Sequence, residues 1–332
     1  MENIRNDAKG KKDLLQLIYG DCTLGVQGEN FHYIFSYQYG GMESLAVDGR
    51  EWLYRVPKPT FWRATTDNDR GNKFPLRSGM WLSADLFQEC INIDILVDGT
   101  RIDTPVAPLN NRYSGYETAE HLRITFTYRT ITVPATEVEV TYEVAANGTI
   151  QVSLHYHGNL SLPELPVFGM RFILPTKACG YRYEGLSGET YPDRMDGGVP
   201  GVFEVKGLPV TRYLVPQDCN VHMGTKWLEV FRDTTRDNSD RERSVFGLKF
   251  SCADKEFAFS CIPYTAQELE NATHQEELPV PRRTVVSILG AVRGVGGINS
   301  WGADVEAPYG IDAGKDISYS FTIARINDTM WS

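Results

Sequence analysis

Apolar and polar residues alternate with a period of two along much of this chain. The alternation is clearest in four stretches of strand length: Arg123–Tyr128, Glu137–Tyr142, Gln151–His155 and Ile317–Ile323. Successive side chains of a β-strand point to opposite faces of its sheet, so such stretches are typical of strands with one buried face and one face toward water. The pattern therefore predicts half-buried antiparallel strands.

Turn-forming dipeptides separate the strand-like stretches at short intervals. They are Asp48-Gly49, Asp98-Gly99, Asn147-Gly148, Gly197-Gly198 and Ala313-Gly314. Few stretches keep a helical period over three turns, and the best of them, Met80–Ile91, fits a helix or a strand. Strands joined by short turns bury their apolar faces by packing sheet on sheet, so we predict an all-β fold built as a large antiparallel β-sandwich.

The length of 332 residues fits two average domains or one large all-β domain. Residues 1–20 are charged and weakly patterned, and we interpret them as an N-terminal tail or linker. The strand pattern starts after them, so we place one β-sandwich domain over residues 21–326. We find no internal repeat and no low-complexity segment.

The net charge of −10 argues against two classes of partner. Such a charge repels a nucleic acid backbone and an anionic membrane surface. No apolar run is long enough to span a membrane, and the N-terminus is polar where a signal peptide has its apolar core, so we expect a cytoplasmic protein. The six cysteines show no C-x-x-C pair and no zinc-ligand spacing, which favours free thiols.

A search for self-contained catalytic motifs finds none. The chain has no G-x-S-x-G nucleophile elbow, no H-E-x-x-H and no P-loop. Asp67–Gly71 begins like a calcium loop, but Gly71 occupies the fifth position and Ser78 stands where a bidentate glutamate is needed. Gly294–Asn299 is only superficially similar to a dinucleotide loop and is better explained as a tight turn. We expect no metal ligand and no catalytic residue on this chain.

Two segments combine aromatic, charged and small polar residues: Phe61–Asn72 and Gly185–Arg194. Short polar side chains of this kind cap turns and hydrogen-bond one another, so the favoured interpretation is a braced loop in each case. In the second segment, Glu189 or Asp193 can in principle act on a substrate, and this alternative stays open.

A third segment, Gly294–Gly302, has glycines on both sides of one tryptophan, Trp301. The glycines free the backbone to project the indole from a loop tip, and a flat apolar ring with one N–H donor suits the C–H face of a sugar. The alternative is a core tryptophan. The small polar neighbours Asn299 and Ser300 give the two interpretations similar weight.

At these three segments the chain resembles a known family. The motifs F-W-R-A-T-T-D-N-D-R-G-N, Y-E-G-L-S-G-E-T-Y-P-D-R and G-V-G-G-I-N-S-W-G are similar, in order and spacing, to the C-terminal domain of the family-2 β-galactosidases. Pro163–Phe172 and Glu268–Leu278 agree as well, and the likeness extends from about Tyr19 to Ile323. One departure is Ser287–Gly290, which has no aspartate where many relatives carry one before the glycine-rich loop.

The resemblance implies more than the residues show. In the family this domain is an antiparallel β-supersandwich with galactose mutarotase-like topology, and in some lactic acid bacteria it is the separate small subunit of a heterodimer. It completes an active site built by a TIM barrel on the large subunit, which holds both catalytic glutamates, Mg²⁺ and Na⁺. The resemblance implies a role in hydrolysing galactosides such as lactose, with Trp301 against the sugar and Asn299 and Ser300 shaping its loop.

Two other functions remain as alternatives. A stand-alone aldose epimerase needs a histidine acid and a carboxylate base, and the candidate histidines are His155, His157, His222 and His274. A purely structural or carbohydrate-binding module is the second alternative. The charged stretch Asp233–Arg243 is interpreted as a solvated loop, and an isolated chain of this kind is expected to self-associate.

Overall fold

The structure is a computed structural model, and it describes residues 14–107, 116–326 and 331. The described residues form one ten-stranded, one six-stranded and one five-stranded sheet, and every strand pairing is antiparallel. The helices are short. They are α1 (Asp67–Gly71), α2 (Phe74–Ser78), η1 (Gly79–Trp81), α3 (Ala266–Asn271), η2 (Gln275–Glu277) and η3 (Ala307–Tyr309). The predicted all-β class is confirmed.

The ten-stranded sheet runs through the whole molecule. In spatial order its strands are β15 (Pro200–Lys206), β14 (Gly180–Leu186), β17 (Trp227–Arg232), β18 (Phe246–Cys252), β21 (Ile317–Arg325), β12 (Ile150–Tyr156), β11 (Glu137–Ala145), β10 (His121–Arg129), β7 (Glu89–Val97) and β8 (Thr100–Ile102). Four of these strands, β10, β11, β12 and β21, coincide with the four stretches of alternating residues, so those strand predictions are confirmed.

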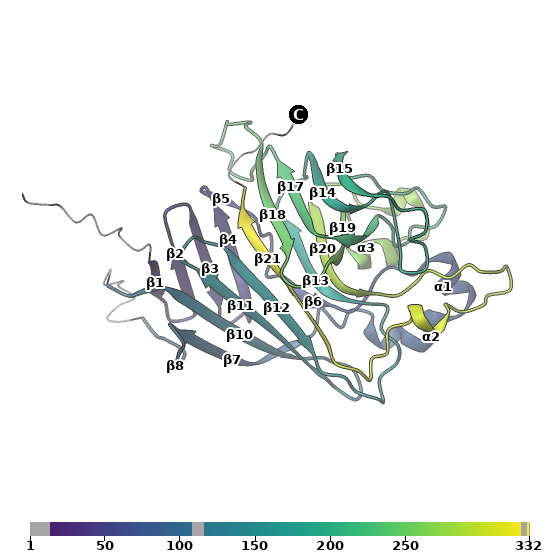
Figure 1. Cartoon of the computed structure of the whole chain (residues 1–332), viewed down its shortest axis with the longest axis horizontal. Helices are drawn as coiled ribbons and strands as arrows, with labels where there is room; N and C mark the ends of the chain where they lie inside the picture. The colour runs from purple at the N-terminus through teal and green to yellow at the C-terminus, as the bar shows by residue number, and fades with distance from the viewer. Residues whose placement is uncertain (1–13, 108–115, 327–330, 332) are drawn as a thin grey trace, which may run out of the picture.

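Two smaller sheets complete the fold. The six-stranded sheet has the order β5 (Arg50–Glu51), β4 (Gly41–Val47), β3 (Phe31–Ser36), β2 (Thr23–Gln27), β1 (Leu15–Tyr19) and β9 (Thr118–Ala119). The five-stranded sheet has the order β16 (Val221–Thr225), β19 (Phe257–Ile262), β20 (Thr284–Val292), β13 (Val167–Leu174) and β6 (Lys58–Thr60). In Figure 1 the six-stranded sheet lies at the left and the five-stranded sheet at the right.

Both smaller sheets pack on the same face of the large one. Phe35 of the six-stranded sheet lies 5.4 Å, between ring centroids, from Tyr142, and Phe172 of the five-stranded sheet lies 6.1 Å from Phe321. Tyr142 and Phe321 share a face because each lies directly opposite Val152 in the register. One continuous hydrophobic core results, and it includes residues of all three sheets.

The hairpin turns follow the predicted chemistry. Asp48-Gly49 connects β4 to β5, and Asp98-Gly99 connects β7 to β8. Both residues of each pair have positive φ, 50° and 71° in the first turn and 50° and 78° in the second. A two-residue turn with both φ values positive matches the twist of the strands that it joins, and Asp-Gly tolerates that backbone.

The structure corrects the predicted tail of residues 1–20. Strand β1 lies at Leu15–Tyr19, and Leu15 and Leu17 are buried in the core, so the domain begins before residue 21. This strand is short and follows a charged stretch, which hides its alternation. At the other end, the Trp331 ring packs on Phe231, so the packed part of the chain also extends beyond residue 326.

The ambiguous stretch Met80–Ile91 is not a helix. It holds the end of the single turn η1, then turns, and then the start of β7 at Glu89. Ser83 has a φ of 63°, and this left-handed backbone interrupts a right-handed helix. Across the described parts of the chain, we also find no helix whose length and apolar character would let it cross a membrane.

Candidate functional site

Trp301 projects from a long connection between β20 and β21. Its side chain is 92% exposed, the highest value among the large hydrophobic residues of the described chain. The connection is the loop that extends beyond α1 and α2 in Figure 1. We name residues Gly294–Gly302 the Trp301 loop. The interpretation of a projecting indole is confirmed over that of a core tryptophan, and the contact with a sugar stays a prediction.

The loop tip is shaped from within by Asn299. Its Oδ1 accepts a hydrogen bond from the backbone N–H of Trp301 at 2.9 Å and from that of Ala303 at 3.3 Å. Gly296 and Gly302 have φ values of 67° and 77°, in the left-handed region that favours glycine. Ser300 is exposed beside the indole. Asn299 therefore fixes the turn that presents Trp301.

The second predicted segment holds one side of the loop base. The carboxylate of Asp193 accepts hydrogen bonds from the backbone N–H groups of Val295 at 2.9 Å and Gly296 at 2.7 Å. Arg194 donates to the carbonyl oxygen of Gly296. The Asp193 side chain is only 6% exposed. The favoured interpretation of this segment as a loop anchor is confirmed for Asp193 and Arg194.

The first predicted segment holds the other side. Asn68 of α1 donates to the carbonyl oxygen of Val295 at 2.9 Å, and Arg63 donates to that of Gly294 at 3.0 Å. Thr66 caps α1, because its side chain accepts from the N–H of Asp69 while the Asp69 carboxylate accepts from the N–H of Thr66. This capping box fixes the first turn of α1, which carries Asn68.

Asp69 is the centre of a buried charge cluster beneath the loop. Its carboxylate lies 3.1 Å from Nη2 of Arg63 and 2.9 Å from Nη1 of Arg293, and all three side chains are buried. Burial alone lowers the pKa of Arg63, but the nearby carboxylates of Asp69 and Asp218 outweigh it and raise that pKa. Because Asp69 already pairs with two buried arginines, its carboxylate is poorly suited to bind calcium.

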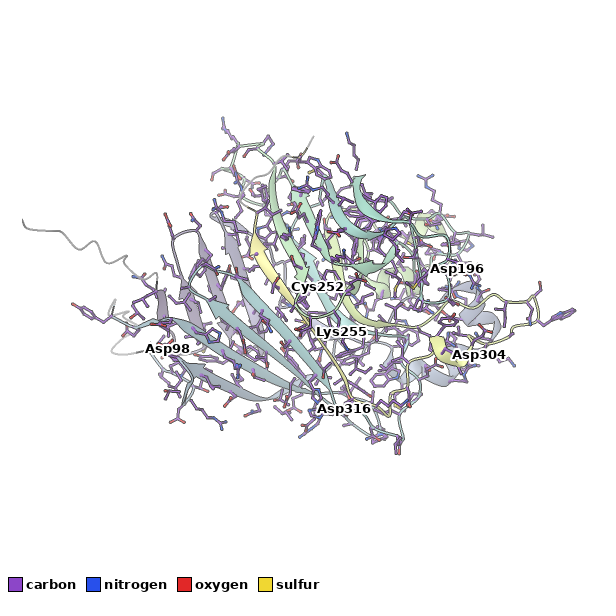
Figure 2. The ribbon with its side chains drawn as sticks, in the orientation of Figure 1. Asp98, Asp196, Cys252, Lys255, Asp304 and Asp316 are labelled. Atoms are coloured by element: carbon purple, nitrogen blue, oxygen red, sulfur yellow. The ribbon has the colours of Figure 1, made fainter. Side chains whose placement is uncertain are left out.

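Asp304 connects the far side of the loop to the same cluster. Its carboxylate pairs with Arg293 and with Arg77 of α2, and it accepts a hydrogen bond from Asn72 at 3.2 Å. Figure 2 shows Asp304 beside the two short helices. Segments far apart in the sequence thus converge on the Trp301 loop. Arg293 and Asp304 were not predicted from the sequence, because no motif marks them.

Glu189, the other open candidate, is engaged elsewhere. Its carboxylate accepts from the backbone N–H of Asn220 at 2.6 Å and from the hydroxyl of Thr211 at 3.2 Å. A retaining glycosidase needs two carboxyl groups about 5 to 5.5 Å apart that face the substrate. Glu189 and Asp193 instead accept hydrogen bonds from backbone amides. Neither carboxylate therefore has the geometry of a catalytic residue.

The four candidate histidines have different surroundings. His222 is buried, burial lowers its pKa to about 4, and its ring stacks on Phe259 at 4.7 Å. His274 is exposed, and its hydrogen bond to Glu277 raises its pKa. His155 and His157 lie together on the open face of the ten-stranded sheet. His222 is thus a packed structural histidine.

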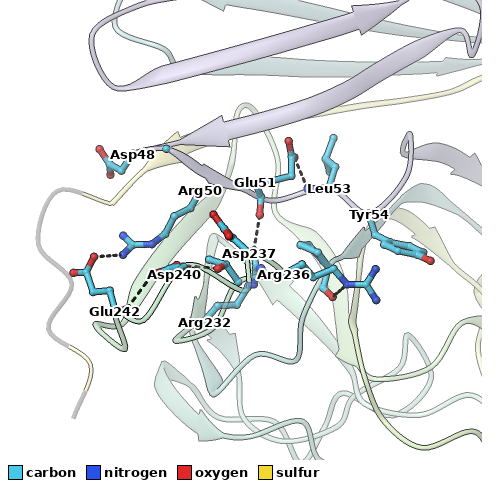
Figure 3. A pocket seen from close by; sticks show the side chains of 13 residues that line it. Asp48, Arg50, Glu51, Leu53, Tyr54, Arg232, Arg236, Asp237, Asp240 and Glu242 are labelled. Carbon is cyan, nitrogen blue, oxygen red and sulfur yellow. Dashed lines mark hydrogen bonds and ion pairs between the residues drawn. The ribbon is translucent and has the colours of Figure 1, made fainter.

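A surface pocket of about 520 Å³ lies elsewhere, between β4–β5 and the segment after β17. Figure 3 shows Arg50 reaching Glu242, and the two side chains are 2.8 Å apart. Arg232, at the pocket floor, is buried and donates to the carbonyl oxygen of Glu51 at 2.8 Å. Most of Asp233–Arg243 is exposed, as predicted for a solvated loop, although Arg50 ties it to β5.

Comparison with known proteins agrees with the motifs that surround the loop. A family model described as "Beta galactosidase small chain" matches residues 27–323. The chain belongs to this β-galactosidase small-chain family. The match includes the Trp301 loop, the buried charge cluster and the strands that carry them, so the braced loop is part of the family domain.

Relatives in this family differ greatly in length. The β-galactosidase small subunit of Latilactobacillus sakei is 61% identical over 93% of this chain and 98% of its own length. The β-galactosidase of Halalkalibacterium halodurans is 31% identical over 96% of this chain, and that of Streptococcus thermophilus is 30% identical over 94%. The chain spans only 29% and 28% of these two longer relatives.

Solved structures with a similar shape include two epimerase-type proteins. A putative aldose 1-epimerase of Escherichia coli has a TM-score of 0.42 at 10% identity, and the match covers 94% of this chain and all of that one. A galactose 1-epimerase of Lactobacillus acidophilus has a TM-score of 0.37 at 11% identity, with 98% of each chain covered. Similarity at this level does not transfer an activity.

Proposed function

We propose that this chain is the small subunit of a heterodimeric retaining β-galactosidase and completes the active site of a TIM-barrel large subunit. Family membership supports this, and so does the relative of nearly equal length that is named a small subunit. The complete enzyme hydrolyses terminal β-D-galactosides such as lactose and transfers galactosyl groups. The longer relatives carry the equivalent region as part of one polypeptide, which fits two chains forming a single site.

The catalytic glutamates belong to the large subunit in this proposal, as do Mg²⁺ and Na⁺. Two observations on the small chain support this division. Glu189 and Asp193, the carboxylates next to the family motifs, bind backbone amides. Asp69, in the segment most similar to a calcium loop, is neutralised by two arginines.

The observation that carries the proposal is the exposure of Trp301 on a braced loop. An indole held exposed on a braced loop offers a flat apolar face with one N–H donor, and a stacked sugar covers such a face well. Trp301 therefore contributes an apolar wall to the galactoside site, Asn299 holds its turn, and Ser300 offers a hydroxyl beside the ring.

Exposed apolar side chains next to this loop support a protein partner. The segment from α2 to the start of β7 exposes five of them: Leu76, Met80, Leu82, Leu86 and Phe87. This segment is connected to the loop, because Arg77 of α2 pairs with Asp304. Several exposed apolar side chains on one short segment are typical of a docking surface. We assign it to the large subunit.

The test substitutes the indole in the assembled enzyme. We expect Trp301→Ala to raise KM for lactose and to weaken glucose as a galactosyl acceptor by roughly 1 to 3 kcal/mol, the free energy of a lost stacking surface. Trp301→Phe keeps an aromatic face and should recover most of the binding. Steady-state kinetics and transfer-product yields measure both effects.

Ile298→Ala is the matched control, since it trims another exposed apolar side chain of the same loop. It should leave KM unchanged. Assembly of every variant is checked by size-exclusion chromatography. Lactose kinetics that are unchanged in assembled Trp301→Ala enzyme would refute the role of the indole.

A further inference from the structure

Two histidines and an aspartate meet on the open face of the ten-stranded sheet. His155 lies in β12 and His157 one residue beyond its end, so their side chains share a face. Asp316 lies one residue before β21, and it falls opposite His157 when the Tyr156–Ile317 pairing is continued. Figure 2 shows Asp316 at the lower edge of the molecule.

The distances between the possible ligand atoms fit a metal site without its ion. One ligand atom from each of His155, His157 and Asp316 lies within 4.8 Å of the other two. Nε2 of His155 is 3.8 Å from Oδ2 of Asp316. Ligand atoms around tetrahedral zinc lie about 3.3 Å apart, so small rotations of these partly exposed side chains close the site.

Neighbouring groups already orient two of the ligands. Nδ1 of His155 forms a 2.6 Å hydrogen bond with Oγ of Ser318, which leaves Nε2 of the ring available. The backbone N–H of Gly158 donates to Oδ1 of Asp316 at 2.8 Å, which leaves Oδ2 available. Hydrogen bonds to the second atom of a ligand are a regular feature of protein metal sites. Two separate contacts therefore support the arrangement.

We propose that His155, His157 and Asp316 bind a divalent transition metal ion of the zinc type. Glu139 lies beside this group, with its Oε1 3.9 Å from Nε2 of His157, and a water molecule completes the coordination. Imidazole nitrogens with carboxylate oxygens suit Zn²⁺, whereas Mg²⁺ and Ca²⁺ prefer oxygen ligands throughout. No metal is predicted from the sequence, because only the register of β12 and β21 brings Asp316 to the two histidines.

The ion ties the end of the long connection that carries the Trp301 loop to β12. Asp316 is where this connection returns to the sheet. A ligand that binds only the folded protein stabilises it in proportion to its affinity and concentration. Zn²⁺ should therefore raise the thermal midpoint of the chain, independently of any effect on enzyme activity.

Isothermal titration of the untagged full chain with ZnCl₂ tests the site. We expect one equivalent of Zn²⁺ to bind to the wild type and to be lost in His155→Gln and in His157→Gln. Ser318→Ala, which removes only the orienting hydrogen bond, should weaken binding roughly 10- to 100-fold. The increase in thermal midpoint should disappear in the two histidine variants.

His121→Gln is the matched control. His121 lies on the same sheet and has a carboxylate 3.8 Å away, Glu143, but among the described residues this pair belongs to no group of three possible metal ligands. This variant should bind Zn²⁺ like the wild type. The proposal would be overturned if the wild type bound no Zn²⁺ at millimolar metal. It would also be overturned if both histidine variants still bound one equivalent of Zn²⁺, because the six free cysteines would then be the ligands.

Discussion

Asp69 shows how one buried carboxylate positions the Trp301 loop from outside that loop. Its carboxylate holds Arg63 and Arg293, and Arg63 in turn donates to the carbonyl oxygen of Gly294 at the base of the Trp301 loop. Removing one partner of a buried ion pair is strongly destabilising, because it leaves the other charge uncompensated. The cluster is therefore a fixed point from which the loop extends.

Replacing Asp69 tests that role. Asp69→Asn leaves two buried arginines without their shared carboxylate, so we expect the free energy of unfolding to fall by on the order of 3 to 5 kcal/mol. Urea titration measures it. Asp67→Asn, which alters an exposed ion pair in the same helix, should change stability by about 0.5 kcal/mol or less. Equal losses in the two variants would contradict the account.

Single residues differ in how far the sequence predicts them. The exposure of Trp301 follows from local features, because glycines and small polar residues surround it. The Asp69–Arg293 contact joins positions 224 residues apart, and only the packing of the sheets brings them together. Asp316 is also distant in sequence from His155 and His157, and the register of β21 against β12 brings them together.

At the scale of elements, the Trp301 loop depends on a second segment for its shape. Asp193 accepts hydrogen bonds from two successive amides at the base of that loop, and the adjacent Arg194 binds a carbonyl oxygen of the same turn. A carboxylate on backbone N–H groups forms charge-assisted hydrogen bonds, which are stronger than neutral ones. The loop is thus held from outside as well as by its own glycines.

Asp193→Asn should loosen the loop without unfolding the domain. Losing a charge-assisted hydrogen bond should make the amides of Val295 and Gly296 exchange with solvent at least about tenfold faster. Hydrogen exchange read out by mass spectrometry or NMR measures this. Asp196→Asn changes an exposed aspartate three positions away and should leave both amides protected. Exchange that stays unchanged in Asp193→Asn would show that the carboxylate does not brace the loop.

The exposed apolar segment gives a prediction for assembly. Phe87→Asp places a charge where we assign the large subunit, and we expect its dissociation constant to rise about tenfold or more, because buried apolar anchors dominate such interfaces. Val280→Asp alters an equally exposed apolar residue in another loop and should not affect assembly. Analytical ultracentrifugation of the mixed subunits measures both. Equal affinity of Phe87→Asp and wild type would place the interface elsewhere.

Elements with strong local patterns are predictable, and those without are not. The four alternating stretches lie within strands, and Asp-Gly pairs form the hairpin turns. Strand β1 escapes notice because only Leu15 and Leu17 mark it, and its partners β2 and β9 are brought to it by the fold. The segment Met80–Ile91 has a helical period, but Ser83 turns the backbone away from a helix.

The whole molecule places its core on one face of the ten-stranded sheet, under both smaller sheets. Alternation along single strands predicts a sandwich, but it does not say which sheets share a face, because that depends on contacts between distant residues. The proposed division of labour with a second chain is likewise invisible in any one motif. The proposal rests on family membership and on a loop that exposes Trp301 to solvent.

The most direct test measures hydrolysis of a chromogenic β-galactoside with Mg²⁺ present, by this chain alone, by its large subunit alone and by the two mixed. The account predicts activity only in the mixture, because our proposal assigns the wall of the site to this chain and the catalytic carboxylates to the other. Hydrolysis by this chain alone would contradict the account. A mixture no more active than the large subunit alone would contradict it as well.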